Sequence, residues 1–102
     1  MSLQIKSSFD NDNNEWEIDL TGEIDISSVN EFRESLEKAY KENKGDITLR
    51  FDNLNYIDST GIGVIIGTYG KMKADRNRIR ILNPKKNIRK LLTITSLDQI
   101  LL

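Results

Sequence analysis

The sequence predicts an α/β fold in which helices cover a mixed β-sheet, and three observations lead to that prediction. Segments with an apolar residue at every second position, typical of half-buried strands, alternate with segments whose apolar residues recur at helical spacing. Asp, Asn, Gly and Pro residues, which favour turns, separate these segments. The 102 residues, 37% of them hydrophobic and 30% charged, suit one globular domain spanning 1–102.

The chain opens with a predicted β-hairpin. A strand is expected over 3–9, where Leu3 and Ile5 alternate with polar residues. The Asp and Asn residues of 10–14 predict a turn, because their side chains bond to their own backbone and tolerate unusual φ angles. The second strand alternates apolar and acidic residues from Trp16 onward, and we expect Gly22 to end it.

A helix follows the hairpin. Ser28 and Glu31 have the spacing of a capping box, in which the serine caps the helix and the glutamate reaches back to it. The helix is expected to run to about Asn43. Its buried face is predicted to consist of the residues at helical spacing, namely Val29, Phe32, Leu36, Ala39 and Tyr40.

The second half of the chain continues the alternation of strands and helices. Strands are expected over 46–52 and 78–82, and a helix between them should bury Ile62, Ile65, Ile66, Tyr69 and Met72. A short third helix is predicted to start at Lys86 or Asn87, and an apolar tail of undetermined form follows it. The expected order is β-β-α-β-α-β-α plus a short C-terminal tail, with right-handed crossovers between parallel strands.

Composition excludes several classes of function. The chain has no Cys and no His, so it cannot form a disulfide, a thiolate metal site or a Ser-His nucleophile pair. We therefore predict no catalytic residue, no metal site and no cofactor. No apolar run approaches the ~20 residues of a membrane span, and residues 1–10 lack the apolar stretch of a signal peptide. A cytoplasmic protein without membrane contact is expected.

Charge is distributed unevenly along the chain. Residues 1–58 hold 14 of the 16 acidic residues, whereas residues 59–102 hold 9 of the 15 basic ones. A basic run of this kind can indicate nucleic-acid binding. Here the overall pI is acidic and no aromatic residues interleave with the bases for stacking, so we interpret the run as solvated helix and strand faces.

The segment Asp58-Ser59-Thr60-Gly61-Ile62-Gly63 stands where a predicted strand runs into a helix. Helix N-termini carry free N–H groups and the positive end of the helix dipole, so they can accommodate an anion. Either Asp58 or Ser59 could simply cap the helix, but the run of hydroxyl and carboxyl groups exceeds what one cap requires. The segment does not match a phosphate-binding loop, and no His or Lys stands ready to activate Ser59. A serine that another enzyme modifies fits these observations.

Two segments, Thr21-Gly22-Glu23-Ile24-Asp25 and residues 56–67, resemble the paired signatures of single-domain STAS proteins, specifically the bacterial anti-sigma factor antagonists. The resemblance implies a STAS-like mixed sheet covered by helices. It also implies that Ser59 is phosphorylated by a partner that is both anti-sigma factor and serine kinase, and that a serine phosphatase reverses this modification. The unphosphorylated form would bind the kinase and release sigma factor.

The residues expected to contact the partner surround Ser59: Glu23, Asp25, Asp58, Thr60, Gly61, Gly63 and Gly67. Several have structural alternatives. Asp58 could cap the helix or orient the serine hydroxyl, and Thr60 could begin the helix or be a second phosphate acceptor. Glu23 and Asp25 could be surface turn residues or contact basic groups of the kinase. The glycines at 63, 67 and 70 could pack the helix on the sheet or form a smooth docking face.

Two other functions stay open on the sequence alone. A STAS protein can act as a scaffold or as a transporter-associated regulatory subunit with a partner unrelated to sigma factors, because fold does not determine function. An enzyme or nucleotide-binding protein is disfavoured by the missing His, Cys and phosphate loop.

Overall fold

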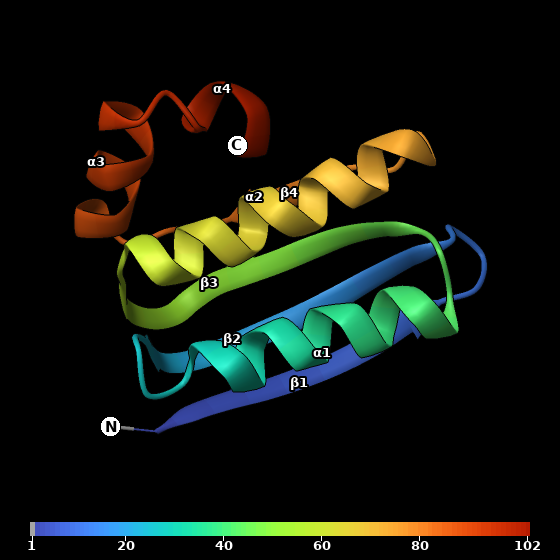
Figure 1. Ribbon diagram of the computed structural model, residues 1–102, viewed down its shortest axis with the longest axis horizontal. Helices are drawn as coiled ribbons and strands as arrows, with labels where there is room; N and C mark the ends of the chain where they lie inside the picture. The colour runs from blue at the N-terminus through green and yellow to red at the C-terminus, as the bar shows by residue number, and fades with distance from the viewer. Residues whose placement is uncertain (1) are drawn as a thin grey trace.

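Four strands form one mixed sheet in a computed structural model, which describes residues 2–102 (Figure 1). The sheet order follows the chain: β1 (Leu3–Asp10), β2 (Glu15–Ile24), β3 (Asp46–Ile57) and β4 (Ile79–Leu82). β1 and β2 pair antiparallel as the predicted hairpin, whereas β2, β3 and β4 run parallel. Parallel neighbours need long connections, and helices supply them.

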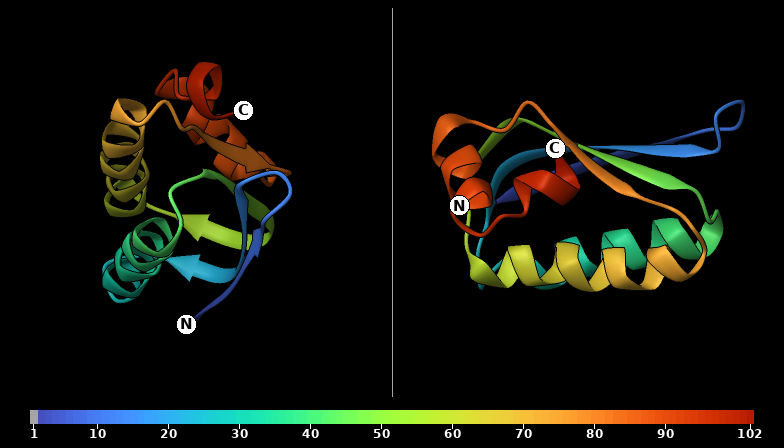
Figure 2. Two further views of the ribbon diagram at one scale, coloured as in Figure 1. Left: turned by 90° about the vertical axis from the view of Figure 1, so that its right-hand side faces the viewer. Right: turned by 90° about the horizontal axis from the view of Figure 1, so that it is seen from above.

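The helices are α1 (Val29–Glu42), α2 (Ser59–Ala74), α3 (Lys86–Ile94) and α4 (Asp98–Leu101). α1 and α2 lie side by side on one face of the sheet, and α3 and α4 lie on the β4 side (Figure 2). Since α1 follows β2 and α2 follows β3, and these parallel strands end side by side, both helices begin at the same end of the molecule. The predicted order is confirmed, and the C-terminal tail adds the short helix α4, which packs on β4.

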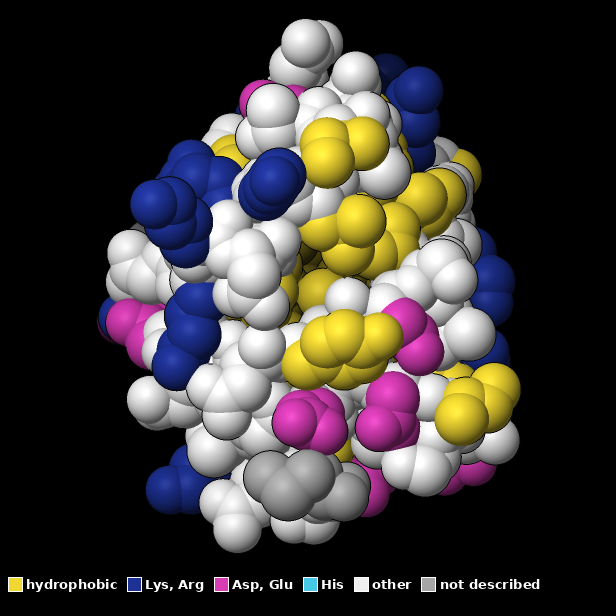
Figure 3. Space-filling view, turned by 90° about the vertical axis from the view of Figure 1, so that its left-hand side faces the viewer, with side chains coloured by type: hydrophobic (Ala, Val, Ile, Leu, Met, Phe, Trp, Pro, Cys, Tyr) yellow, Lys and Arg dark blue, Asp and Glu magenta, His cyan; other side chains and the backbone are white. Residues whose placement is uncertain are grey.

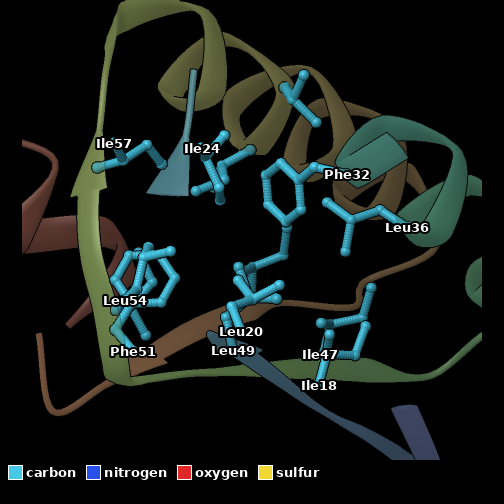
Figure 4. Packing of buried hydrophobic residues seen from close by; sticks show 14 of the residues in the cluster. Ile18, Leu20, Ile24, Phe32, Leu36, Ile47, Leu49, Phe51, Leu54 and Ile57 are labelled. Carbon is cyan, nitrogen blue, oxygen red and sulfur yellow. The ribbon is translucent and has the colours of Figure 1, made fainter. Parts of the chain in front are cut away.

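The hydrophobic core lies between the sheet and the pair of helices α1 and α2. Phe32 and Leu36 of α1 point toward the sheet residues Leu20, Ile24 and Ile47 (Figure 4). All five side chains are fully buried. The predicted inward face of α1 is confirmed, because Val29, Phe32, Leu36 and Ala39 are buried and Tyr40 packs against the core.

Two strands extend further than the sequence predicts. β2 does not end at Gly22 but continues to Ile24, and β3 continues past residue 52 to Ile57. The two ends pair through Ile24 and Ile57, after register shifts in the ladder around Thr21 and Gly22. Gly22 adopts a φ of 111°, a conformation open to glycine, so the strand passes through an irregularity where it was expected to end.

Two helix details also differ from prediction. The capping box is wrong: Ser28 is the N-cap of α1, but its hydroxyl makes no capping bond within the helix. On α2, Ile66 is 47% exposed, whereas Val64 is buried in its place. An apolar residue at helical spacing was therefore assigned to the wrong face, because α2 is apolar on more than one side.

Gly61, in the first turn of α2, is the position where this helix approaches the sheet most closely. A Cβ atom there would lie 2.6 Å from Cγ1 of Ile57 and 2.7 Å from Cγ2 of Ile24. Both isoleucines belong to the buried core and cannot move freely. Gly63, Gly67 and Gly70 differ, since a Cβ at any of them would meet nothing within 4 Å.

We expect Gly61→Ala to lower the free energy of unfolding by about 1–3 kcal/mol, because the new methyl overfills the contact with β2 and β3. The matched change Gly70→Ala should raise the free energy of unfolding by up to about 1 kcal/mol, since alanine has a higher helix propensity than glycine and the new methyl meets no other atom. Urea denaturation of the two variants measures both effects. Equal stabilities would contradict the close packing of Gly61.

Candidate functional site

The start of α2 is held by one carboxylate. Oδ1 of Asp58 accepts hydrogen bonds from the backbone N–H groups of Thr60, at 3.0 Å, and Gly61, at 3.3 Å. The hydroxyl of Thr60 donates to the same oxygen at 2.5 Å. Asp58 is therefore the N-cap, which supports the structural alternative for this residue. Thr60 likewise has a structural role at the helix start.

Ser59 is the first residue of α2 and is exposed to solvent. Within residues 2–102, its hydroxyl takes no part in the hydrogen bonds of this turn, which all converge on Asp58. The helix therefore does not depend on Ser59 for capping. Its hydroxyl is free for an external group, and the α2 dipole points its positive end toward this position.

The turn between β2 and α1 lies next to the start of α2. The backbone N–H of Asp58 donates to the carbonyl oxygen of Ile24 at 3.2 Å, so the ends of β2 and β3 are joined here. The hydroxyl of Ser28 shapes the turn, because it donates to the carbonyl of Glu23 at 2.8 Å and accepts from the N–H of Asp25 at 3.0 Å. Both acidic residues of the first signature are half-buried beside the Ser59 junction.

Two carboxylates make this end of the molecule acidic. The Thr60 hydroxyl, with help from the N–H groups of Gly61 and Thr60, holds the pKa of Asp58 below its ordinary value. The Ser27 hydroxyl and N–H likewise lower the pKa of Asp25. The negative charge of Asp25 acts in the opposite direction and raises the pKa of Asp58, because the two carboxylates repel each other. Both are therefore ionised at neutral pH.

Exposed apolar side chains accompany these acids, a feature that the sequence reasoning missed. Figure 3 views this end of the molecule, where acidic and hydrophobic side chains lie next to one another on the surface. Ile26, in the turn before α1, is 76% exposed, and Tyr56, near the end of β3, is 46% exposed. The sequence did hold an indication of this surface: Ile26 is flanked by Asp25 and Ser27 in a turn, where it belongs to no buried strand or helix face.

A groove of about 360 Å³ runs between α1 and α2 from Ser59. Arg33 and Glu37 line it from α1, and α2 lines it with Ser59, Thr60, Gly63, Val64, Gly67, Thr68 and Lys71. Because Gly63 and Gly67 have no side chains, the backbone of α2 is accessible from the groove. The alternative in which these glycines pack α2 on the sheet is wrong.

The structure thus brings most of the predicted site residues to one end of the molecule. Asp58 and Thr60 flank Ser59 in the chain, and the pairing of Ile24 with Ile57 brings the turn with Glu23 and Asp25 to the same end. Gly63 and Gly67 continue the surface along α2. Gly61 is the exception, because it is buried against the core and offers a partner no surface. Among residues 2–102, no three Asp, Glu, His or Cys side chains gather in a way that could hold a metal ion. In the same range, no helix has both the length and the apolar character needed to cross a bilayer.

Curated relatives share most of the chain. An anti-sigma-B factor antagonist of Staphylococcus aureus is 30% identical over 86 residues, which cover 84% of this chain and 80% of the relative. The anti-sigma-B factor antagonist of Staphylococcus epidermidis matches with the same identity and coverage.

Two solved structures of SpoIIAA have a similar fold. The anti-sigma factor antagonist SpoIIAA, in its unphosphorylated form, is 25% identical with a TM-score of 0.73, covering 88% of this chain and 82% of that protein. The Bacillus cell fate determinant SpoIIAA in its phosphorylated form superposes over 99% of this chain and 89% of its own, with a TM-score of 0.74 and 24% identity. At that identity, the second match is evidence of a shared fold.

The STAS domain family model matches residues 10–102, which include every element from the end of β1 to α4. This match covers both signatures, the β2–α1 turn and the β3–α2 junction that together build the site. The chain belongs to the STAS domain family.

Proposed function

We propose that this protein is an anti-sigma factor antagonist, a cytoplasmic regulator rather than an enzyme, that switches partners according to the phosphorylation state of Ser59. In its unphosphorylated form it binds an anti-sigma factor that is also a serine kinase, and so releases sigma factor. The kinase phosphorylates Ser59 and ends the interaction. A serine phosphatase restores the active form.

The observation that carries this proposal is the free, exposed hydroxyl of Ser59 at a helix start already capped by Asp58. A structural serine at this place would be engaged in the cap. The names of the staphylococcal relatives support the antagonist role. SpoIIAA has been seen both unphosphorylated and phosphorylated, which supports a switch of this chemical kind.

The switch would act at the contact surface and leave the fold intact. Phosphorylation adds a charge of about −1.5 to −2 at neutral pH, and a helix N-terminus tolerates such a charge. The same charge next to Asp58 and Asp25 makes this end of the molecule far more negative. A partner that binds here must then desolvate an unpaired anion, which weakens binding. We propose Glu23, Asp25, Thr60, Gly63 and Gly67 as contact residues and leave out the buried Gly61.

Incubation of the protein with the anti-sigma kinase from the same genome and ATP should place the phosphate on Ser59, because its hydroxyl alone in this turn is exposed and unbonded within residues 2–102. Thr60 and Ser27 are the internal controls, since their hydroxyls donate to Asp58 and Asp25. Phosphosite mapping by mass spectrometry decides between them. A phosphate mainly on another residue would refute the assignment.

The Ser59→Ala variant should fold, melt within a few degrees of the wild type, and bind the kinase whether or not ATP is present. Ser59→Asp should fold equally well but bind at least about tenfold more weakly, because its charge enters the contact surface. Calorimetric titration with the kinase measures both affinities. If both variants bind like the wild type, the charge does not control the interaction.

The exposed glycines provide an independent test of the docking face. Gly67→Leu should keep or raise the free energy of unfolding, by up to about 1 kcal/mol, since the new side chain meets no other residue and favours the helix. It should nevertheless weaken kinase binding about tenfold, because it fills the groove between α1 and α2. Gly70→Leu is the matched control, as exposed as Gly67 but outside the groove lining. Equal binding of the two variants would remove the groove from the contact surface.

A further inference from the structure

The groove between α1 and α2 joins Ser59 to a basic side chain on the neighbouring helix. Arg33 of α1 lines the groove together with Ser59 and Gly63 of α2. Within residues 2–102, the Arg33 guanidinium makes one hydrogen bond, to Oδ1 of Asn30 at 2.5 Å, and no ion pair. A guanidinium has five N–H donors, so most of those on Arg33 are unused.

We propose that phosphorylated Ser59 turns its phosphoryl group into the groove between α1 and α2, where Arg33 binds it. This inference rests on the proposed modification of Ser59. Arg33 would be the residue that binds the phosphoryl group, and the open space above Gly63 would accommodate that group.

Three backbone donors that follow Ser59 at the start of α2 are already occupied. The N–H groups of Thr60 and Gly61 are directed at Asp58, and the N–H of Ile62 donates to the Asp58 carbonyl. A phosphoryl group on Ser59 would have to displace the capping carboxylate to reach the first two. The Arg33 donors are available without any such loss.

Charge also favours the groove. On one side of Ser59 stand the ionised carboxylates of Asp58 and Asp25, which repel a phosphoryl dianion. On the other side, the charged groups lining the groove are Arg33, Glu37 and Lys71. The phosphoryl group therefore moves away from the acids and toward the groove.

The geometry of the two helices selects Arg33 over Lys71. Lys71 is twelve residues beyond Ser59, or about 18 Å along the α2 axis. Arg33 is one turn into α1, and α1 and α2 begin at the same end and lie side by side (Figure 2). Helical side chains lean toward the N-terminus of their helix, so Arg33 extends toward the level of Ser59. Gly63 leaves room above α2, because a Cβ there would meet nothing within 4 Å.

The test uses protein with phosphoserine incorporated at position 59 during translation, so it does not depend on any kinase. The ³¹P chemical shift as a function of pH gives the second pKa of the phosphoryl group. An adjacent cation favours the dianion, so this pKa should be about half a unit or more lower in the wild type than in Arg33→Gln. Arg78→Gln is the control: it removes an exposed charge just before β4, at the opposite end of the sheet, and should leave the pKa unchanged.

A second readout reports on the arginine itself. The Nε–H resonance of Arg33 should shift when Ser59 is replaced by phosphoserine. The Arg33→Lys variant, which keeps a positive charge, should have a phosphoryl pKa between those of the wild type and Arg33→Gln. If Arg33→Gln and Arg78→Gln give the same phosphoryl pKa, the phosphoryl group does not contact Arg33 and the proposal is wrong. Because the phosphoserine is encoded, this failure is distinguishable from a failure of the proposed function, which would appear as an unmodified Ser59 after incubation with the kinase.

Discussion

The contact between the first turn of α2 and the ends of β2 and β3 is the constraint on which the site depends. Gly61 lies against Ile24 and Ile57, closer than any residue with a side chain could lie. This contact fixes where α2 begins relative to the sheet, and therefore where Asp58 and Ser59 stand. The parallel pairing of Ile24 with Ile57 then brings the β2–α1 turn, with Asp25, to the same place. The packing at Gly61 and the pairing of β2 with β3 thus bring the two signatures to one surface.

Adjacent residues at the start of α2 differ in whether they take part in capping the helix. Asp58 satisfies the first N–H groups of α2, and Thr60 donates its hydroxyl to the same carboxylate. Ser59 lies between them in sequence and takes no part in this network within the described chain. A modification of Ser59 can therefore change the charge of the surface without removing an interaction that holds the helix. This separation suits a switch that acts on a partner while the fold persists.

The glycines of α2 serve opposite purposes. Gly61 is required by the interior, where any side chain would collide with β2 and β3. Gly63, Gly67 and Gly70 face open space, and each costs the helix roughly 1 kcal/mol relative to alanine without any packing in return. A helix that retains such residues on an exposed face is consistent with a surface that something approaches closely. The groove beside Gly63 and Gly67 gives an approaching group room, and Arg33 in its lining adds a positive charge.

The sequence by itself determined the order of elements, the inward face of α1 and the position of Ser59 at a strand-to-helix junction, because these follow from local periodicity and turn chemistry. Tertiary structure decided what depends on neighbours distant in the chain. Local pattern ended β2 at Gly22, but pairing with β3 carries it to Ile24. Spacing suggested that Ser28 caps α1, but its hydroxyl is drawn to the backbone of Glu23 and Asp25. Arg33 and Ser59 line one groove because α1 and α2 pack side by side on the sheet, and the residues near either position in the chain do not determine that contact.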